Sequence, residues 1–158
     1  MANEPNGGNG NGSSSVPIRV YNLRLVYLQD VSFEAPHAPA ILFGQELQPE
    51  LKFQIESSHR QRDKNAWEVI LHASVHATAG DKSLFLVEVK QGGLFEITGF
   101  TTEETMLLLK IKAPEALYPY ASELISSLVS RGGFPRLQLQ PINFEALYAE
   151  ARQARPQA

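Results

Sequence analysis

Apolar and polar side chains alternate along two stretches of this sequence, and this pattern restricts the fold more than any other feature. In residues 67–77 apolar residues fall at every second position, and residues 50–57 repeat the same period. Successive side chains of a β-strand point to opposite faces. Alternation this regular therefore predicts an antiparallel sheet with one face covered. The apolar series are Leu51, Phe53 and Ile55, then Trp67, Val69, Leu71, Ala73 and Val75.

Two further strands bring the predicted sheet to four. Residues 18–34 are rich in Val, Leu, Tyr and Phe, with a period of two that slips near Gln29, where we expect a bulge or bend. Residues 83–91 form the fourth strand, and Gly80 supplies the backbone angles of the hairpin turn before it. The polar residues 57–65 are expected to form the loop between the second and third strands.

The second half of the chain carries helical patterns. Thr101 and Glu104 have the spacing of a capping box, and Pro114 is expected to end the helix that they begin. A second helix, beginning around Pro119 and ending at a Gly-Gly pair, has an apolar stripe at spacings of three and four residues. Strands followed by helices predict an α+β fold, with the helices on one side of the four-stranded antiparallel sheet.

The chain divides into a tail, one domain and a second tail. Residues 1–16 are mostly Asn, Gly and Ser, and we expect them to be disordered because they have little apolar surface to bury. The domain covers residues 17–152 and ends in a helix capped by Asn143, and residues 153–158 form a short C-terminal tail. Residues 35–49 are an apolar, proline-rich crossover segment. This segment either packs over the core or lines a binding site for apolar groups.

Composition and missing motifs exclude several classes of function. The formal net charge of −3 argues against nucleic-acid and anionic-membrane partners, which need a basic patch. The absence of cysteine excludes disulfides and cysteine zinc sites. Neither a secretory signal nor a run of roughly 18–20 apolar residues is present, so we expect a cytoplasmic protein. No phosphate loop, nucleophile elbow, zinc-protease or EF-hand motif occurs, so we expect neither an enzyme nor a cofactor.

Two histidines and one carboxylate are candidates for metal binding or acid–base chemistry. His72 and His76 lie on a predicted strand, where four residues span about 13 Å, too far for one shared metal ion. A small acid–base enzyme using Glu88 with either histidine is a competing interpretation.

Acidic residues also gather on one predicted face. Asp30 and Glu34 share a face of the first strand, and Leu86 and Glu88 share a face of the fourth. An acidic patch around an exposed leucine suits the docking of a basic partner, and an ordinary solvated sheet face is the alternative.

Four segments resemble, in the same order, motifs of the SecB export chaperones. The resemblance covers residues 18 to about 150, and four motifs in register are far more specific than one. The segments are residues 30–39, residues 85–95, residues 119–121 with 129–135, and residues 141–148.

This resemblance implies an α+β protomer assembled as a homotetramer, a dimer of dimers. It implies an ATP-independent chaperone that binds unfolded preproteins, keeps them translocation-competent and delivers them to the SecA motor. The family's SecA-binding residues correspond to Asp30, Glu34, Leu86 and Glu88. Its client groove, between the crossover, the second strand and the last helix, corresponds to Phe43, Leu47, Leu51, Phe53, Ile55 and Tyr148.

The chain departs from the family pattern at two places. Leu47 stands where members often have tryptophan, and the tail of residues 153–158 is not acidic. The alternatives to an export chaperone are a SecB-like chaperone serving a toxin–antitoxin system and a plain oligomeric scaffold.

Overall fold

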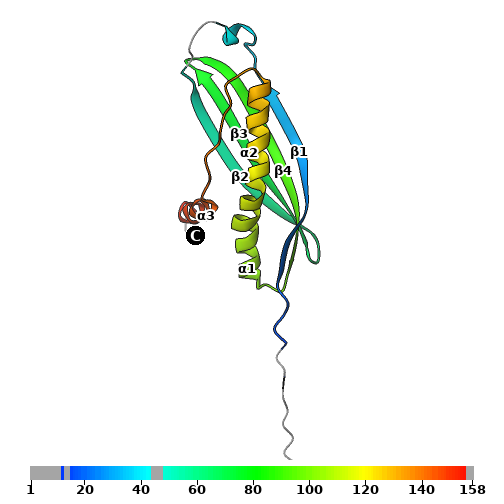
Figure 1. The fold of residues 1–158 in the computed structure, drawn as a ribbon. Coiled ribbons are helices and arrows are strands. Elements are labelled where there is room, and N and C mark those ends of the chain that lie inside the picture. Colours follow the sequence, from blue (N-terminus) through cyan, green and yellow to red (C-terminus); the bar gives the residue numbers. More distant parts are fainter. Residues whose placement is uncertain (1–11, 13–14, 44–47, 156–158) are drawn as a thin grey trace, which may run out of the picture.

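Four long strands form one antiparallel sheet in a computed structural model of the protein (Figure 1). The strands are β1 (Val20–Glu34), β2 (Glu50–Asp63), β3 (Ala66–Ala79) and β4 (Lys82–Thr98). Their order across the sheet is β1-β4-β3-β2, so β1 and β2 are the edge strands. The predicted four-stranded antiparallel sheet is confirmed.

The structure describes residues 12, 15–43 and 48–155. Most of the predicted tail of residues 1–16 therefore lies outside the described residues. So do Leu47 of the predicted groove and the last three residues of the chain.

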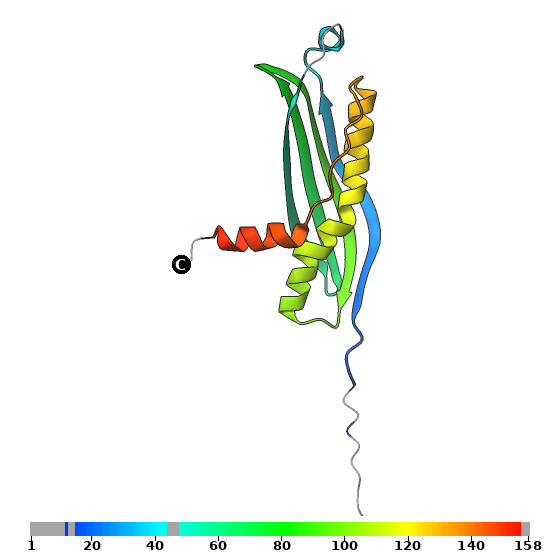
Figure 2. The ribbon, with the colours of Figure 1, turned by 60° about the vertical axis from the view of Figure 1, so that its left-hand side comes forward.

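A continuous helical segment crosses one face of the sheet (Figure 1). It consists of α1 (Thr102–Leu107), a π-helical turn η2 (Leu108–Lys112) and α2 (Ala113–Arg131). The last helix, α3 (Phe144–Gln153), lies beyond the β2 edge and projects from the body (Figure 2). A short 3-10 helix, η1 (Ala40–Leu42), lies in the crossover between β1 and β2.

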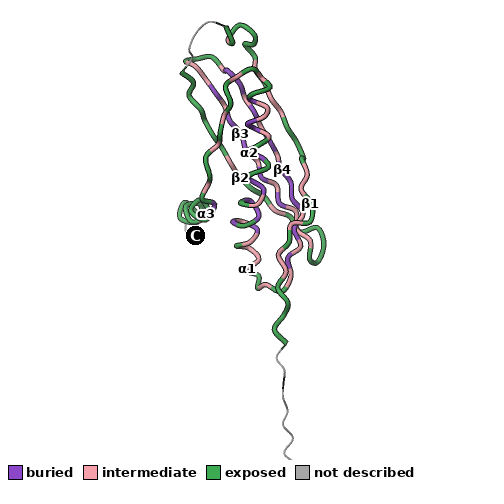
Figure 3. The backbone as a smooth tube through the Cα atoms, viewed as in Figure 1, coloured by how far each residue is buried: buried purple, intermediate pink, exposed green. Residues whose placement is uncertain are grey.

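The core lies between α2 and the two central strands (Figure 3). On β3 and β4 every second residue is buried, which matches the predicted period of two. The buried side of α2 carries Leu117, Ala121, Ile125 and Val129, each one helical turn from the next. The opposite face of the sheet carries no helix in the described part of the chain, so one face is covered and the other is open.

Two strands extend further than predicted. The expected loop of residues 57–65 is wrong, because β2 continues to Asp63 and only Lys64 and Asn65 form the turn. An edge strand can be polar on both faces, so Ser58 and Arg60 pair with β3 without being buried. β4 likewise continues past the predicted end at residue 91.

The prolines do not divide the helices as predicted. Pro114 does not end a helix, because it lies in the first turn of α2, directly after the π-helical turn. Pro119 does not begin a helix either and lies inside α2 with its side chain exposed. The predicted caps are confirmed: Thr101 and Glu104 form a capping box, and the Asn143 side chain accepts from the Ala146 N–H at 3.0 Å.

Candidate functional site

The acidic residues singled out from the sequence lie together on the open face of the sheet. Glu34 is opposite Leu86 in the β1–β4 pairing, and Ser32, two residues before Glu34, is opposite Glu88. Val87, between Leu86 and Glu88, is fully buried on the helix side, so its two neighbours face away from α2. The register shift between Leu28 and Asp30 confirms the bulge expected near Gln29 and sets Asp30 on the same face as Glu34.

We name Asp30, Glu34, Leu86 and Glu88 the docking patch, after the role proposed for them below. Asp30 and Glu34 are exposed, while Leu86 and Glu88 are half-buried. None of the six ion pairs among the described residues includes one of the three carboxylates. Lys90 is opposite Asp30 in the β1–β4 register, so one cationic residue lies among the acidic residues of the patch.

His72 and His76 lie on the same open face of the sheet, but their hydrogen-bond partners are residues other than Glu88. His72 Nδ1 lies 3.2 Å from Glu56 Oε1, and His76 Nε2 lies 3.0 Å from Ser83 Oγ. Neither ring is hydrogen-bonded to Glu88. Within the described residues no group of three potential metal ligands occurs. The arrangement supports a polar sheet surface rather than an acid–base pair.

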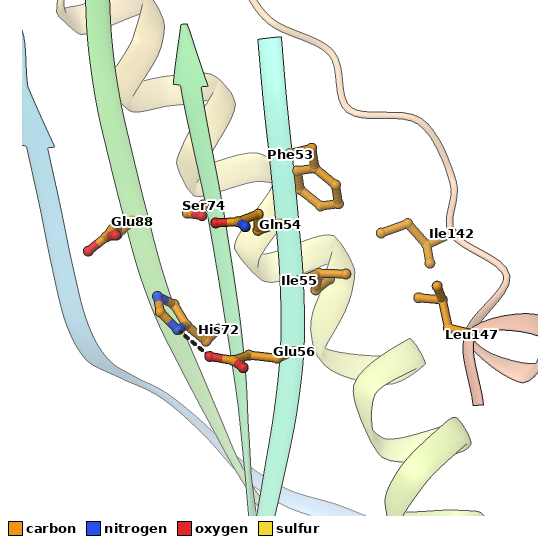
Figure 4. A pocket seen from close by; sticks show the side chains of 9 residues that line it. All are labelled: Phe53, Gln54, Ile55, Glu56, His72, Ser74, Glu88, Ile142 and Leu147. Atoms are coloured by element: carbon orange, nitrogen blue, oxygen red, sulfur yellow. Dashed lines mark hydrogen bonds and ion pairs between the residues drawn. The ribbon is translucent and has the colours of Figure 1, made fainter. Parts of the chain in front are cut away.

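An apolar groove follows the outer edge of β2. Phe53 and Ile55 point from β2 toward Ile142 and Leu147, which lie across from them (Figure 4). The cavity that they border has a volume of about 620 Å³ and continues around the strand to polar residues of the open face, among them His72. Phe53 remains 37% exposed, so this apolar surface is open to solvent in the protomer.

A second cavity continues the groove under α3. Ile55 and Leu147 line both cavities, and the second has a volume of about 760 Å³. Burial, and secondly the charge of Lys110, lower the pKa of His59 below its ordinary value of 6.5, so this wall presents a neutral imidazole at neutral pH. The further apolar lining of this cavity is Leu71, Phe144, Tyr148, Ala151 and Ala154.

The structure brings together only part of the predicted groove. Phe53, Ile55 and Tyr148 line the two cavities. Leu51 continues the same row on β2, 48% exposed, and Phe43 is 75% exposed in the crossover, but neither lines these cavities. Ile41 of the crossover packs against the core, so that segment is partly pinned and partly open.

Six apolar groove residues are absent from the predicted set, namely Leu71, Ile142, Phe144, Leu147, Ala151 and Ala154. Leu147 and Phe144 share the apolar stripe of α3 with Tyr148, and that spacing could have identified them. Ile142 lies in the irregular segment before α3, where no period marks it.

The backbone of β2 adds a second kind of binding capacity. As an edge strand, β2 has one side that no other strand of the described chain occupies. An extended polypeptide can pair with such an edge through main-chain hydrogen bonds while its alternate side chains enter the adjacent groove.

The described helices include none that is long and apolar enough to cross a membrane.

Comparison with known proteins gives consistent results. The family model described as "Preprotein translocase subunit SecB" matches residues 16–155. The chain is 38% identical over 157 residues to a "Protein-export protein SecB" of Xylella fastidiosa, covering 99% of this chain and 91% of that protein. It is 42% identical over 137 residues to the protein of the same name from Xanthomonas campestris pv. campestris, covering 87% and 80%.

A solved structure has the same fold. It is the SecB-like chaperone of Mycobacterium tuberculosis in complex with a ChAD peptide from the HigA1 antitoxin. The match covers 77% of this chain and 90% of that chain, with a TM-score of 0.59 and 21% sequence identity.

Proposed function

The chain belongs to the SecB family of preprotein-export chaperones, which is not a family of enzymes, and from this premise we propose how it works. It binds unfolded preproteins without ATP, keeps them translocation-competent in the cytoplasm and delivers them to the SecA motor.

The observation that carries this proposal is the apolar groove left open between β2 and α3. A folded client hides its apolar groups, whereas an unfolded client offers long stretches of them. Covering apolar surface gains about 25 cal/mol per Å², so burying roughly 1,000 Å² is worth about 25 kcal/mol gross. Ordering the client and restricting its motion cancel most of that gain.

Specificity is expected to be loose. The groove offers apolar side chains such as Phe53 and Leu147, and the β2 edge offers backbone groups that pair with any sequence except at proline. We propose Phe43, Leu47 and Leu51 as outlying contacts for a longer client segment.

Delivery requires a second surface, and we assign it to the docking patch. Its carboxylates lie on the open face, where a basic surface of SecA can approach Asp30 and Glu34 outside both cavities, while Glu88 lies at the polar margin of the first cavity. Half-buried Leu86, among these carboxylates, supplies an apolar contact.

The protomer also has surfaces suited to self-assembly. No strand of the described residues pairs with the outer edge of β1, and this strand carries exposed Leu25, Leu28 and Val31. An exposed apolar edge strand tends to pair with another chain. We propose that β1 pairs with a second copy and that the dimers associate into a homotetramer, which binds one long client at several grooves with raised avidity.

Calorimetry tests the proposal directly. One precursor protein is titrated in its unfolded form and again after folding. We expect micromolar or tighter binding to the unfolded form only, and light scattering should give about one client chain per tetramer. Equal affinity for both forms would refute the chaperone mechanism.

A SecB-like chaperone of a toxin–antitoxin system is the second candidate. It is favoured by the complex of the Mycobacterium tuberculosis chaperone with an antitoxin peptide, but that chain shares only the fold. Relatives named for protein export at 38% and 42% identity favour the export function.

A further inference from the structure

A third cavity lies on the other side of α3, between α3 and α1. It has a volume of about 510 Å³. Leu107, on α1, is 39% exposed. Tyr148 lines both this cavity and the one under α3, so its ring forms a wall between them. The apolar lining is Met106, Leu107, Tyr148 and Ala151.

This α1–α3 groove has an excess of cations. Lys110, Arg152 and Arg155 line it, against a single carboxylate, that of Glu103, whereas the cavity under α3 shares Lys110 and Arg155 but carries two carboxylates, those of Glu56 and Glu150. Lys110 Nζ lies 6.0 Å from the centre of the Tyr148 ring, and the Arg152 guanidinium carbon lies 5.7 Å from it. No ion pair among the described residues includes any of the three cations.

The π-helical turn η2 explains how Lys110 reaches the α1–α3 groove. Leu109 and Ile111 are both buried in the core, and Lys110 between them is half-buried. A π-helical turn contains more residues than an α-helical turn and shifts the phase of the following side chains. Lys110 therefore emerges between two core residues and extends toward α3, with its ammonium group against Tyr148.

We propose that the α1–α3 groove binds acidic segments of the unfolded client, in which a large apolar side chain is flanked by Asp or Glu. The inference rests on the proposed chaperone function and adds a client class to it. The apolar side chain packs against Leu107 and Tyr148, while the carboxylates approach the three cations. The docking patch on the open face is acidic and repels such a segment, so client and motor are directed to different surfaces.

The test compares two versions of one unfolded precursor. In the second version the Asp and Glu residues of one apolar segment are replaced by Asn and Gln. We expect the full-length protein to bind the acidic version about threefold to tenfold more tightly at low ionic strength, and high salt should remove the difference. The triple variant Lys110→Gln with Arg152→Gln and Arg155→Gln should bind both versions equally.

The matched control is Lys82→Gln, which removes a lysine beside the β3–β4 turn, outside the groove. It should keep the preference, and circular dichroism should show that all variants are folded. If wild-type protein binds both versions equally, or prefers the amide version, the acidic preference is wrong while the chaperone function stands. If neither version binds, the proposed function fails and the preference fails with it.

Discussion

At the scale of single residues, Tyr27 connects three strands on the open face. Its hydroxyl donates to Glu68 Oε2 at 2.6 Å, and its ring covers Gly92 of β4, where a Cβ atom would clash with the ring. Glycine is therefore required at 92 by close packing. Burial, and secondly the hydrogen bond to Glu68, raise the pKa of Tyr27 to about 12.

We predict a dependence of stability on alkaline pH from this tyrosine. A raised pKa in the folded state means that the stabilisation is complete below the ordinary pKa of 10.0 and is lost as the pH rises toward about 12. Tyr27→Phe should lower the free energy of unfolding by about 1 kcal/mol at neutral pH. Urea denaturation at about pH 9 and about pH 11 should show a smaller loss for the variant than for wild type. Part of the loss should remain, because the pKa of Tyr21 is also raised to about 12. Identical losses would contradict the assignment.

Charge reversal in the docking patch is a second prediction at this scale. Asp30→Lys and Glu88→Lys should each weaken SecA binding by roughly threefold to tenfold at low salt, because attraction becomes repulsion. Affinity for an unfolded client should not change in Asp30→Lys, because Asp30 lines neither groove cavity, whereas Glu88 lines the first cavity and its variant is used for the SecA measurement alone. Asp81→Lys, in the β3–β4 turn, is the matched control. Unchanged SecA affinity in both variants would remove the patch from the mechanism.

At the scale of elements, the groove exists because α2 and α3 diverge. α2 packs over the central strands β3 and β4, and β2 meets the helical segment at the π-helical turn η2 instead. The chain then returns toward the β2 edge, where Ile142 and the first turn of α3 complete the groove. Only Phe144 of α3 is buried, so the rest of this helix extends beyond the body.

Substitutions in the groove should weaken client binding without unfolding the protein. The double variant Phe53→Ser with Leu147→Ser removes two partly exposed apolar side chains, so we expect about a tenfold or greater loss of affinity for unfolded client with little loss of stability. Val16→Ser removes an apolar residue that is 83% exposed outside the groove and should leave the affinity unchanged. Fluorescence anisotropy with a labelled unfolded precursor measures both. An intact affinity in the double variant would place the client elsewhere.

At the scale of the whole molecule, the two edge strands have different roles in the proposal. β2 borders the groove and receives the client, whereas β1 carries the exposed apolar side chains that we assign to self-association. The sheet thus separates client binding and assembly onto opposite edges.

Charge on the β1 edge should therefore reduce assembly. Leu28→Lys with Val31→Lys places repelling cations on both copies of a pairing edge. We expect light scattering to show smaller particles than wild type at the same protein concentration. The affinity for a long client should fall more than the affinity for a short peptide, because only the long client benefits from several grooves. An unchanged particle mass would show that the copies associate through another surface.

The sequence by itself determined that there are four strands, which of their faces are apolar, and where the helix caps lie, but not how far β2 and β4 extend. Alternation in β2 and β3, the slip near Gln29, and the capping residues Thr101 and Asn143 act over a few residues, where backbone geometry alone sets the pattern. The motifs of the chain also pointed to its family. The polar residues at the end of β2, such as Ser58, were predicted to form a loop. A local sequence pattern does not distinguish a solvent-exposed strand from a loop.

Only the tertiary structure decided which distant residues meet. The strand order β1-β4-β3-β2 places Glu34 beside Leu86, and the path of the chain before α3 places Ile142 opposite Phe53. The π-helical turn, which directs Lys110 toward Tyr148, likewise has no signature in the periodicity. Local patterns report which face of an element is apolar, whereas the partner of that face is chosen by packing between segments far apart in the chain.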